Sequence, residues 1–192
     1  DLDNTLWGGI IGEDGFNGIK LSQNDPIGKA FIEFQKYLLS LHERGIILAV
    51  NSKNNLEDAI QVIKEHPNMV LREKHFSCLK INWNDKVINL QEIAQELNIG
   101  LDSMLFIDDD QVNRDYVREA LPEVLTIELP NDPSLYASKL TELNDFNVIK
   151  ITDEDKKRGK MYLQQRHRIE FQKTITNFED YLKKLNIKIH IK

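Results

Sequence analysis

Residues 45–52 read Gly-Ile-Ile-Leu-Ala-Val-Asn-Ser, an unbroken apolar run that ends in two polar side chains. A strand with one solvated face alternates apolar and polar residues, whereas a strand covered on both faces does not. The run Ile46–Val50 is strand-sized and therefore predicts a buried strand of a parallel sheet. Met104–Ile107 and Val124–Ile127 are expected to be two further strands.

Helical patterns separate these strands. Asp25 followed by Pro26 is typical of an N-cap and a first helical residue, and Gly45 is typical of a helix end. Four more helices are expected, from Asn55 to before Pro67, from Asp85 to Asn98, up to Leu121, and around Ser134–Leu143. The alternation predicts an α/β fold, a three-layer Rossmann-like parallel sheet covered by helices.

The pattern changes after residue 150, so we expect a core domain at 1–150 and a helical extension at 151–192. Thr152 and Asp155 predict the start of a long helix that reaches about Lys173. The extension carries 11 Lys/Arg against 6 Asp/Glu, although the whole chain has a net charge of -6. The alternating isoleucines at 187–191 predict a strand that begins a following, truncated domain.

Composition narrows the class of protein. The chain has 192 residues, of which 41% are hydrophobic, enough for one buried core. No apolar run approaches the roughly 20 residues of a membrane span. The one cysteine, Cys78, excludes an internal disulfide and fits a reducing cytoplasm. We expect a cytoplasmic protein whose partners are neither membranes nor nucleic acids.

Four polar clusters follow predicted strands or lie in loops beside them: Asp1-Leu2-Asp3-Asn4-Thr5, Asn51-Ser52-Lys53-Asn54, Lys86, and Asp108-Asp109-Asp110. The carboxyl ends of parallel strands share one edge of a sheet, so these clusters are expected to meet. This placement requires a strand upstream of Asp1. Crowded carboxylates favour a divalent cation, and Mg²⁺ prefers oxygen ligands and bridges to phosphate.

These motifs, in this order, resemble the haloacid dehalogenase superfamily, and the resemblance to its FkbH-like branch covers almost the whole chain. The resembling stretches are DLDNTLWGGIIGEDG, RGIILAVNSKNN, NWNDK, LNIGLDSMLFIDDDQVNRDYVR and LPEVLTIELPNDP. The resemblance implies a magnesium-dependent phosphatase or phosphotransferase. The short flap at about residues 6–24 leaves no room for a lid domain, so a capless, open site is expected.

The resemblance also implies roles for individual residues. Asp1 would be the nucleophile that forms an aspartyl-phosphate, and Asp3 the general acid and base. Ser52 and Lys86 would hold the phosphoryl group. Asp108, the Asp1 carboxylate and the Asp3 carbonyl would bind Mg²⁺, with Asp109 as a second-choice ligand. Thr5, Asn51 and Lys53 are further candidates for phosphate binding, although Lys86 is favoured over Lys53.

One departure from the FkbH-like pattern concerns acyl transfer. That branch has a cysteine, proposed to hold a glyceryl group before transfer to an acyl carrier protein, where this chain has Asn51. An amide cannot form a thioester, and Cys78 is more typical of a small buried residue. Glyceryl transfer, from a phosphorylated three-carbon donor to a carrier protein, is therefore the alternative function. The region beyond residue 192 would be acyltransferase-like by the same resemblance.

Two non-enzymatic alternatives are less consistent with the motifs. A phosphoacceptor receiver domain also uses acidic residues, a Ser/Thr and a lysine, but its acidic pair precedes the phosphorylated aspartate, and it lacks D-x-D-N-T. A catalytically inactive scaffold would not need Asp1, Asp3, Lys86 and Asp108 together. Trp7 and Trp83 are expected to pack, or to line the substrate entrance.

Overall fold

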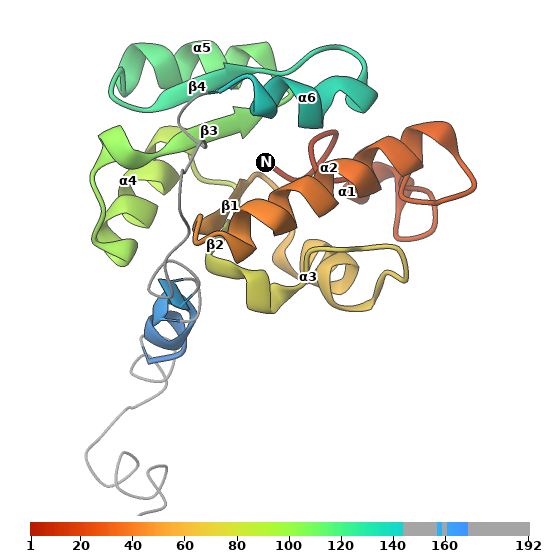
Figure 1. Ribbon diagram of the computed structural model, residues 1–192, viewed down its shortest axis with the longest axis horizontal. Coiled ribbons are helices and arrows are strands. Elements are labelled where there is room, and N and C mark those ends of the chain that lie inside the picture. The colour runs from red at the N-terminus through yellow and green to blue at the C-terminus, as the bar shows by residue number, and fades with distance from the viewer. Residues whose placement is uncertain (144–156, 159–160, 169–192) are drawn as a thin grey trace, which may run out of the picture.

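The computed structural model describes residues 1–143, 157–158 and 161–168, and within them it has a mixed α/β architecture (Figure 1). The helices are α1 (Ile11–Asp14), α2 (Pro26–Glu43), α3 (Leu56–Glu65), α4 (Lys86–Leu97), α5 (Gln111–Ala120) and α6 (Tyr136–Thr141). The strands are β1 (Leu48–Ser52), β2 (Phe76–Ile81), β3 (Leu105–Asp108) and β4 (Leu125–Glu128). Short 3-10 turns lie at Glu73–His75, Leu101–Ser103 and Pro133–Leu135.

The strands form two parallel pairs. β1 pairs with β2, with Ser52 opposite Ile81, and β3 pairs with β4, with Asp108 opposite Glu128. The prediction of parallel strands is therefore confirmed. The expected single sheet is not seen among the described residues, which contain two two-stranded sheets instead.

A cavity of about 630 Å³ lies between the two sheets. Its lining is mainly apolar and includes Leu48, Val50, Phe106 and Ile107 from the facing strands, and Asp1 also reaches it. Consequently Leu48 is only half-buried and Ala49 is exposed, although the sequence predicts a strand covered on both faces. The N–H of Asp1 donates to the carbonyl of Ile107 at 2.8 Å, which places residue 1 beside β3 (Figure 1).

The helix ends agree with the sequence, although the cap expected from Asn55 is absent. The Asp25 side chain accepts a hydrogen bond from the N–H of Gly28, as its position before Pro26 predicts. Asn55 precedes α3 as expected, but its side chain makes no capping bond and instead contacts Asp58 and Trp83. Asn98 caps the C-terminal end of α4 and adopts the left-handed conformation that an asparagine tolerates.

The largest apolar cluster fixes the segment between Asp3 and β1. Trp7, Leu21 and Phe31 are fully or almost fully buried there. An antiparallel bridge between Gly8 and Lys20 folds the predicted flap back on itself. Between Asp3 and β1, the structure has only this flap with α1, followed by α2, so the expectation of a capless core agrees with this part of the chain.

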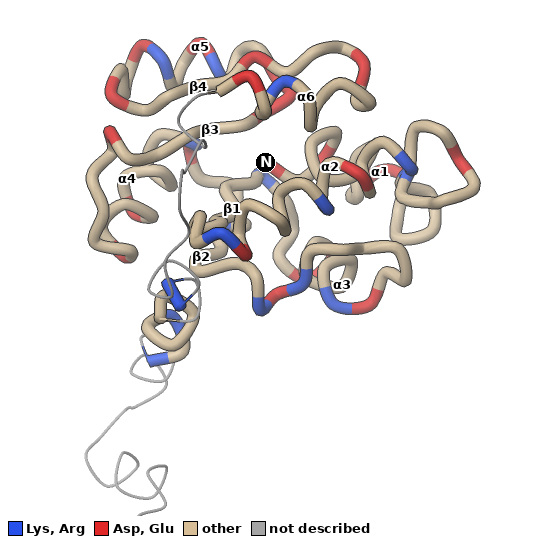
Figure 2. The backbone as a smooth tube through the Cα atoms, viewed as in Figure 1, with Lys and Arg blue, Asp and Glu red and all other residues tan. Residues whose placement is uncertain are grey.

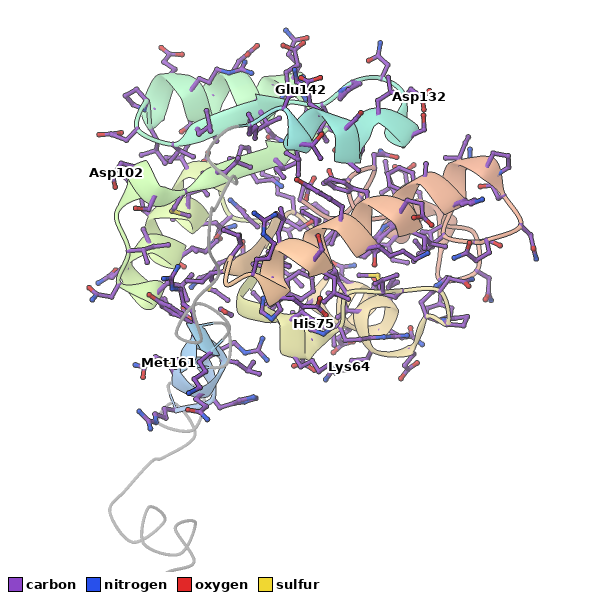
Figure 3. The ribbon with its side chains drawn as sticks, viewed as in Figure 1. Lys64, His75, Asp102, Asp132, Glu142 and Met161 are labelled. Atoms are coloured by element: carbon purple, nitrogen blue, oxygen red, sulfur yellow. The ribbon has the colours of Figure 1, made fainter. Side chains whose placement is uncertain are left out.

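Residues 161–168 are helical and lie beside β2, with Met161 exposed (Figure 3). Arg166 attaches this segment to the core, because its buried guanidinium donates to the carbonyl of Phe76 at 2.7 Å. The rest of the predicted helix and the predicted strand at 187–191 lie outside the described residues. In the part of the chain that is described, no helix combines the length and the apolarity that crossing a bilayer requires.

We predict that Gly28→Ala destabilises the fold. Alanine normally favours a helix over glycine by about 1 kcal/mol. Here the added Cβ would lie 2.4 Å from the backbone nitrogen of Ser22, so the flap or α2 must shift. A loss of about 1–3 kcal/mol in the free energy of unfolding is expected from such overpacking, measured by urea denaturation followed by circular dichroism.

Gly12→Ala in α1 is the matched control. A Cβ at Gly12 has nothing within 4 Å, so this variant should be as stable as the parent protein or slightly more stable. Equal stability of Gly28→Ala and Gly12→Ala would contradict the close approach of α2 to the flap.

Candidate active site

The four polar clusters predicted from the sequence meet at the carboxyl ends of the strands. Asp1 lies between the sheets, Ser52 ends β1, Lys86 opens α4 after the short loop that follows β2, and Asp108 ends β3. In Figure 2, acidic and basic positions of the backbone lie near the N-terminus. The structure brings the side chains of Asp1, Lys86 and Asp108 into contact, as predicted, and connects Ser52 to Asp3 through Asn54.

Lys86 is the centre of this site. Its side chain is 1% exposed, and its Nζ lies 2.9 Å from Oδ1 of Asp1 and 3.0 Å from Oδ2 of Asp108. The same Nζ donates to the carbonyl of Asn51 at 2.8 Å. Burial lowers the pKa of Lys86, and the carboxylate of Asp108 opposes that shift. One carbonyl acceptor and two carboxylate ion-pair partners therefore surround this ammonium group.

Asp1, Asp108 and Asp109 form a cluster whose candidate ligand oxygens all lie within 4.8 Å of one another. Oδ1 of Asp1 and Oδ2 of Asp108 are buried and accept no well-aligned hydrogen bond, although both face Lys86. Burial, followed by the charge of Asp108, raises the pKa of Asp109. Such a group of oxygens has one ammonium partner for three carboxylates, and it could hold a divalent cation.

Backbone contacts hold the acidic end of β3 in place. The guanidinium of Arg114, which lies one turn into α5, donates to the carbonyls of Asp108 and Asp109 at 2.9 and 2.6 Å. Oδ1 of Asp108 accepts from the N–H of Asp110 at 3.0 Å and from Nδ2 of Asn113 at 3.3 Å. These bonds leave Oδ2 of Asp108 directed at Lys86.

The carboxylate of Asp3 lies outside this cluster. Its Oδ1 accepts from Nε1 of Trp7 at 2.8 Å and from the N–H of Ile11 at 3.1 Å, and its Oδ2 accepts from Nδ2 of Asn54 at 3.0 Å. Three uncharged donors therefore orient this side chain. The backbone carbonyl of Asp3, which is the atom of this residue predicted to bind a metal, takes no part in these bonds.

The end of β1 supplies Ser52 and Asn51, whose side chains have different surroundings. Oγ of Ser52 is buried and accepts from Nδ2 of Asn54 at 3.1 Å. Nδ2 of Asn51 donates to the carbonyl of Lys86 at 2.9 Å, and its Oδ1 accepts from Asn89 at 3.0 Å. Both polar ends of the Asn51 amide are thus occupied by α4, so this residue orients Lys86 in addition to accepting from its Nζ.

The other candidate residues lie at the margins of the site. Lys53 is exposed, whereas Lys86 is buried between the carboxylates, so the structure brings the favoured lysine into the cluster. Thr5 is 2% exposed, lines the cavity between the sheets, and its hydroxyl has no partner among the described residues. The thiol of Cys78 is fully buried in β2, in a cluster with Ile93 and Leu97.

The two tryptophans differ in a way that their sequence context does not indicate. Trp7 is fully buried and also donates to Asp3, so it packs in the core and orients the Asp3 carboxylate. Trp83 is 70% exposed, and its Nε1 donates to Asn55 at 3.1 Å. Trp83, Asn54 and Asn82 line a groove of about 580 Å³ that adjoins the site.

Sequence reasoning missed the roles of Asn54, Asn89 and Arg114. Asn54 belongs to a polar cluster that the sequence does single out, but nothing in its spacing indicates that it would turn back toward Asp3. Asn89 and Arg114 lie one turn inside α4 and α5, so each can reach the strand end that precedes its helix. A polar residue at the fourth position of a helix that follows a catalytic strand is the signal that could have identified both.

Comparisons with known proteins agree with this geometry. A search of family models and a search of curated proteins each found no match. Among solved structures, the chain resembles the N-terminal part of the protein BF1531 from Bacteroides fragilis, containing a phosphatase domain complexed with Mg, with a TM-score of 0.75 and 45% sequence identity. The match covers 78% of this chain and 40% of that one, so this chain spans less than half of its neighbour. The similarity to a magnesium-bound phosphatase domain is consistent with the resemblance to haloacid dehalogenase phosphatases inferred from the sequence motifs.

Proposed function

We propose that this chain catalyses magnesium-dependent phosphoryl transfer and hydrolyses phosphate monoesters through an aspartyl-phosphate on Asp1. The observation that carries the proposal is the buried Lys86 ammonium, which joins the carboxylates of Asp1 and Asp108. The similarity to a phosphatase domain complexed with Mg supports it. Asp1 is the oxygen nucleophile that such a reaction requires.

In the proposed first step, a carboxylate oxygen of Asp1 attacks phosphorus and the bond from phosphorus to the leaving oxygen breaks. Asp3 donates a proton to that oxygen, which departs as an alcohol. In the second step, Asp3 takes a proton from water, and the water oxygen attacks phosphorus. Inorganic phosphate leaves and the Asp1 carboxylate is restored, so one water is consumed per ester.

The remaining residues hold the phosphoryl group and its charge. Lys86 would donate to a phosphoryl oxygen and to Asp1, and the Ser52 hydroxyl would donate to a second phosphoryl oxygen. Asp1, Asp108 and Asp109, with the carbonyl of Asp3, are the groups that would hold Mg²⁺. When bound, the ion would neutralise the crowded carboxylates and the charge on the phosphoryl oxygens.

We also infer the finer fold that this chemistry requires, a single three-layer Rossmann-like sheet of the haloacid dehalogenase type. The cavity between β1 and β3 is lined mainly by apolar side chains, and the Asp1 nitrogen donates to the carbonyl of Ile107 at its edge. A further strand between β1 and β3 would join the two pairs of strands into one sheet.

The leaving group would lie over the groove beside Asn54, with Trp83 on its rim. With only the short flap before β1, that side of the site is open, which suits a large or carrier-bound phosphorylated substrate. We therefore also propose an acyl carrier protein as the partner that would present such a substrate.

Glyceryl transfer, the alternative function, has less support from this geometry. It requires a thiol close to the aspartyl-phosphate, and the Asn51 amide that replaces the expected cysteine already bonds α4 at both ends. Cys78 is fully buried, and burial, followed by the charge of Glu96, raises the pKa of its thiol to about 12. At neutral pH this thiol is almost entirely protonated and is a poor nucleophile.

We predict that Asp1→Asn abolishes phosphate release and that Asp3→Asn lowers kcat by about 10²–10⁴-fold. The first change removes the nucleophile and the second removes the acid and base. Asp102→Asn, which alters an exposed aspartate at the opposite end of β3 (labelled in Figure 3), should retain full activity. Substantial turnover by Asp1→Asn, measured as released phosphate, would show that water attacks phosphorus directly.

We predict that Mg²⁺ stabilises the protein through the acidic cluster. At a concentration 100 times its Kd, a ligand specific for the native state adds about 2.7 kcal/mol. Asp108→Asn should abolish the Mg²⁺-induced rise in Tm and Asp109→Asn should reduce it, because each loses a carboxylate ligand. Asp110→Asn is the control, since Asp110 is exposed and caps α5, a role that asparagine retains. An equal rise in Tm in all three variants would place the metal elsewhere.

We predict that Cys78 in the native protein resists iodoacetamide and acquires no glyceryl group from a phosphoglyceryl donor. Its buried, protonated thiol explains both results. Intact-protein mass spectrometry measures both adducts, and the urea-unfolded chain, which should be alkylated rapidly, is the control. A glyceryl adduct that disappears in Cys78→Ser would instead establish the acyl-transfer reaction.

A further inference from the structure

Asn54 occupies a position between two groups of the proposed reaction that the sequence does not connect. We propose that Asn54 is a positioning residue, which orients the acid/base Asp3 and sets the direction of the Ser52 hydroxyl with one amide group. This inference rests on the phosphatase function proposed above. It assigns a role to a side chain that is 4% exposed, although its neighbours Lys53 and Asn55 are exposed.

The amide nitrogen of Asn54 has two hydrogens and two acceptors. It donates to Oδ2 of Asp3 at 3.0 Å and to Oγ of Ser52 at 3.1 Å. A carboxylate offers only acceptors, so the group that faces Asp3 must be the nitrogen and not the oxygen of the amide. The orientation of Asn54 therefore follows from the chemistry of Asp3.

The contact with Asp3 selects one of its two oxygens for proton transfer. Oδ1 already accepts from Nε1 of Trp7 and the N–H of Ile11, so both of its lone pairs are engaged. Oδ2 accepts only from Asn54 among the described residues, and one of its lone pairs stays open. Oδ2 is consequently the oxygen with room for the proton that Asp3 passes to the leaving group.

The contact with Ser52 selects the direction of a proton as well. A serine oxygen that accepts from Asn54 keeps its own hydrogen for another acceptor. In the proposed reaction that acceptor is a phosphoryl oxygen. Asn54 thus couples the group that holds the phosphoryl oxygens to the group that protonates the leaving oxygen, across a sequence separation of 51 residues between Asn54 and Asp3.

Two substrates separate this role from a merely structural one. An alkyl phosphate needs Asp3 to protonate its leaving oxygen, whereas 2,4-dinitrophenyl phosphate releases a stable phenolate without that proton. Asn54→Ala should lower kcat for the alkyl phosphate by about 10²-fold, the order expected when a catalytic group is misplaced by 1 Å. It should leave KM within a few-fold and Tm close to that of the parent protein.

Asn54→Ala with 2,4-dinitrophenyl phosphate should release phenolate in the first turnover almost as fast as the parent protein. Later turnovers should be slow, because Asp3 must still activate water, so a burst of phenolate stoichiometric with enzyme is expected. Asn54→Asp keeps the size of the side chain but places a second acceptor against Asp3. It should lower kcat for the alkyl phosphate at least as much as Asn54→Ala does. Asn84→Ala, at an exposed asparagine in the loop before α4, is the matched control.

Three outcomes would overturn the proposal. Full activity of Asn54→Ala on the alkyl phosphate would show that Asp3 needs no help from the amide. Equal losses with both substrates in the first turnover, or a large fall in Tm, would show that Asn54 supports the fold alone. If the parent protein with Mg²⁺ releases phosphate from neither substrate, the phosphatase function itself is wrong. That failure is seen in the parent protein alone, so it is distinguishable from a failure of the role of Asn54, which is seen only in the variants.

Discussion

The arrangement of this site depends on one buried cation. Lys86 is almost inaccessible to water, so its charge requires acceptors, and the three that it finds come from Asp1, the end of β1 and the end of β3. Satisfying one ammonium group thereby fixes three separate chain segments relative to each other. Removing one member of such a buried group leaves uncompensated charge and typically costs about 3–5 kcal/mol. The lysine that would hold phosphate therefore also holds the ends of β1 and β3 in place relative to each other.

Much of this could be predicted from the sequence, because strands and their polar ends follow simple rules. The run at residues 46–50 is followed by Asn51 and Ser52, and the run at 104–107 by Asp108, so polar residues were predictable at the carboxyl end of each strand. β1 and β3 belong to different sheets, and Lys86 links their ends through the Asn51 carbonyl and the Asp108 carboxylate. The ends of the helices were predictable wherever a single residue decides them, as Asp25 does for α2. What could not be predicted is which partner a side chain chooses. Asn55 turns to Trp83 and Asp58 instead of capping α3, because tertiary contacts offer it those alternatives.

The surroundings of Asp3 and Asn51 illustrate the same limit within the site. Tryptophan is a residue type that usually packs in a core, and only the folded loop shows that the Nε1–H of Trp7 is also directed at Asp3. Asn51 stands where the resembling branch has a cysteine, and the sequence predicts from this only the loss of a thiol. The structure adds that the amide bonds the backbone of Lys86 and the side chain of Asn89, contacts that a cysteine could not make in the same way. At this position, therefore, the chain has a group that orients Lys86.

Two aspartates only two residues apart occupy different environments, and this difference supports a division of roles. Asp1 shares the buried Lys86 ammonium with Asp108 and lies beside the carboxylate of Asp109. Asp3 receives only neutral N–H donors and has one open lone pair on Oδ2 among the described residues. A nucleophile must stay ionised next to the phosphoryl group, whereas an acid/base must exchange a proton without losing its orientation. Two carboxylates whose environments differ in this way can act as nucleophile and proton carrier in one reaction.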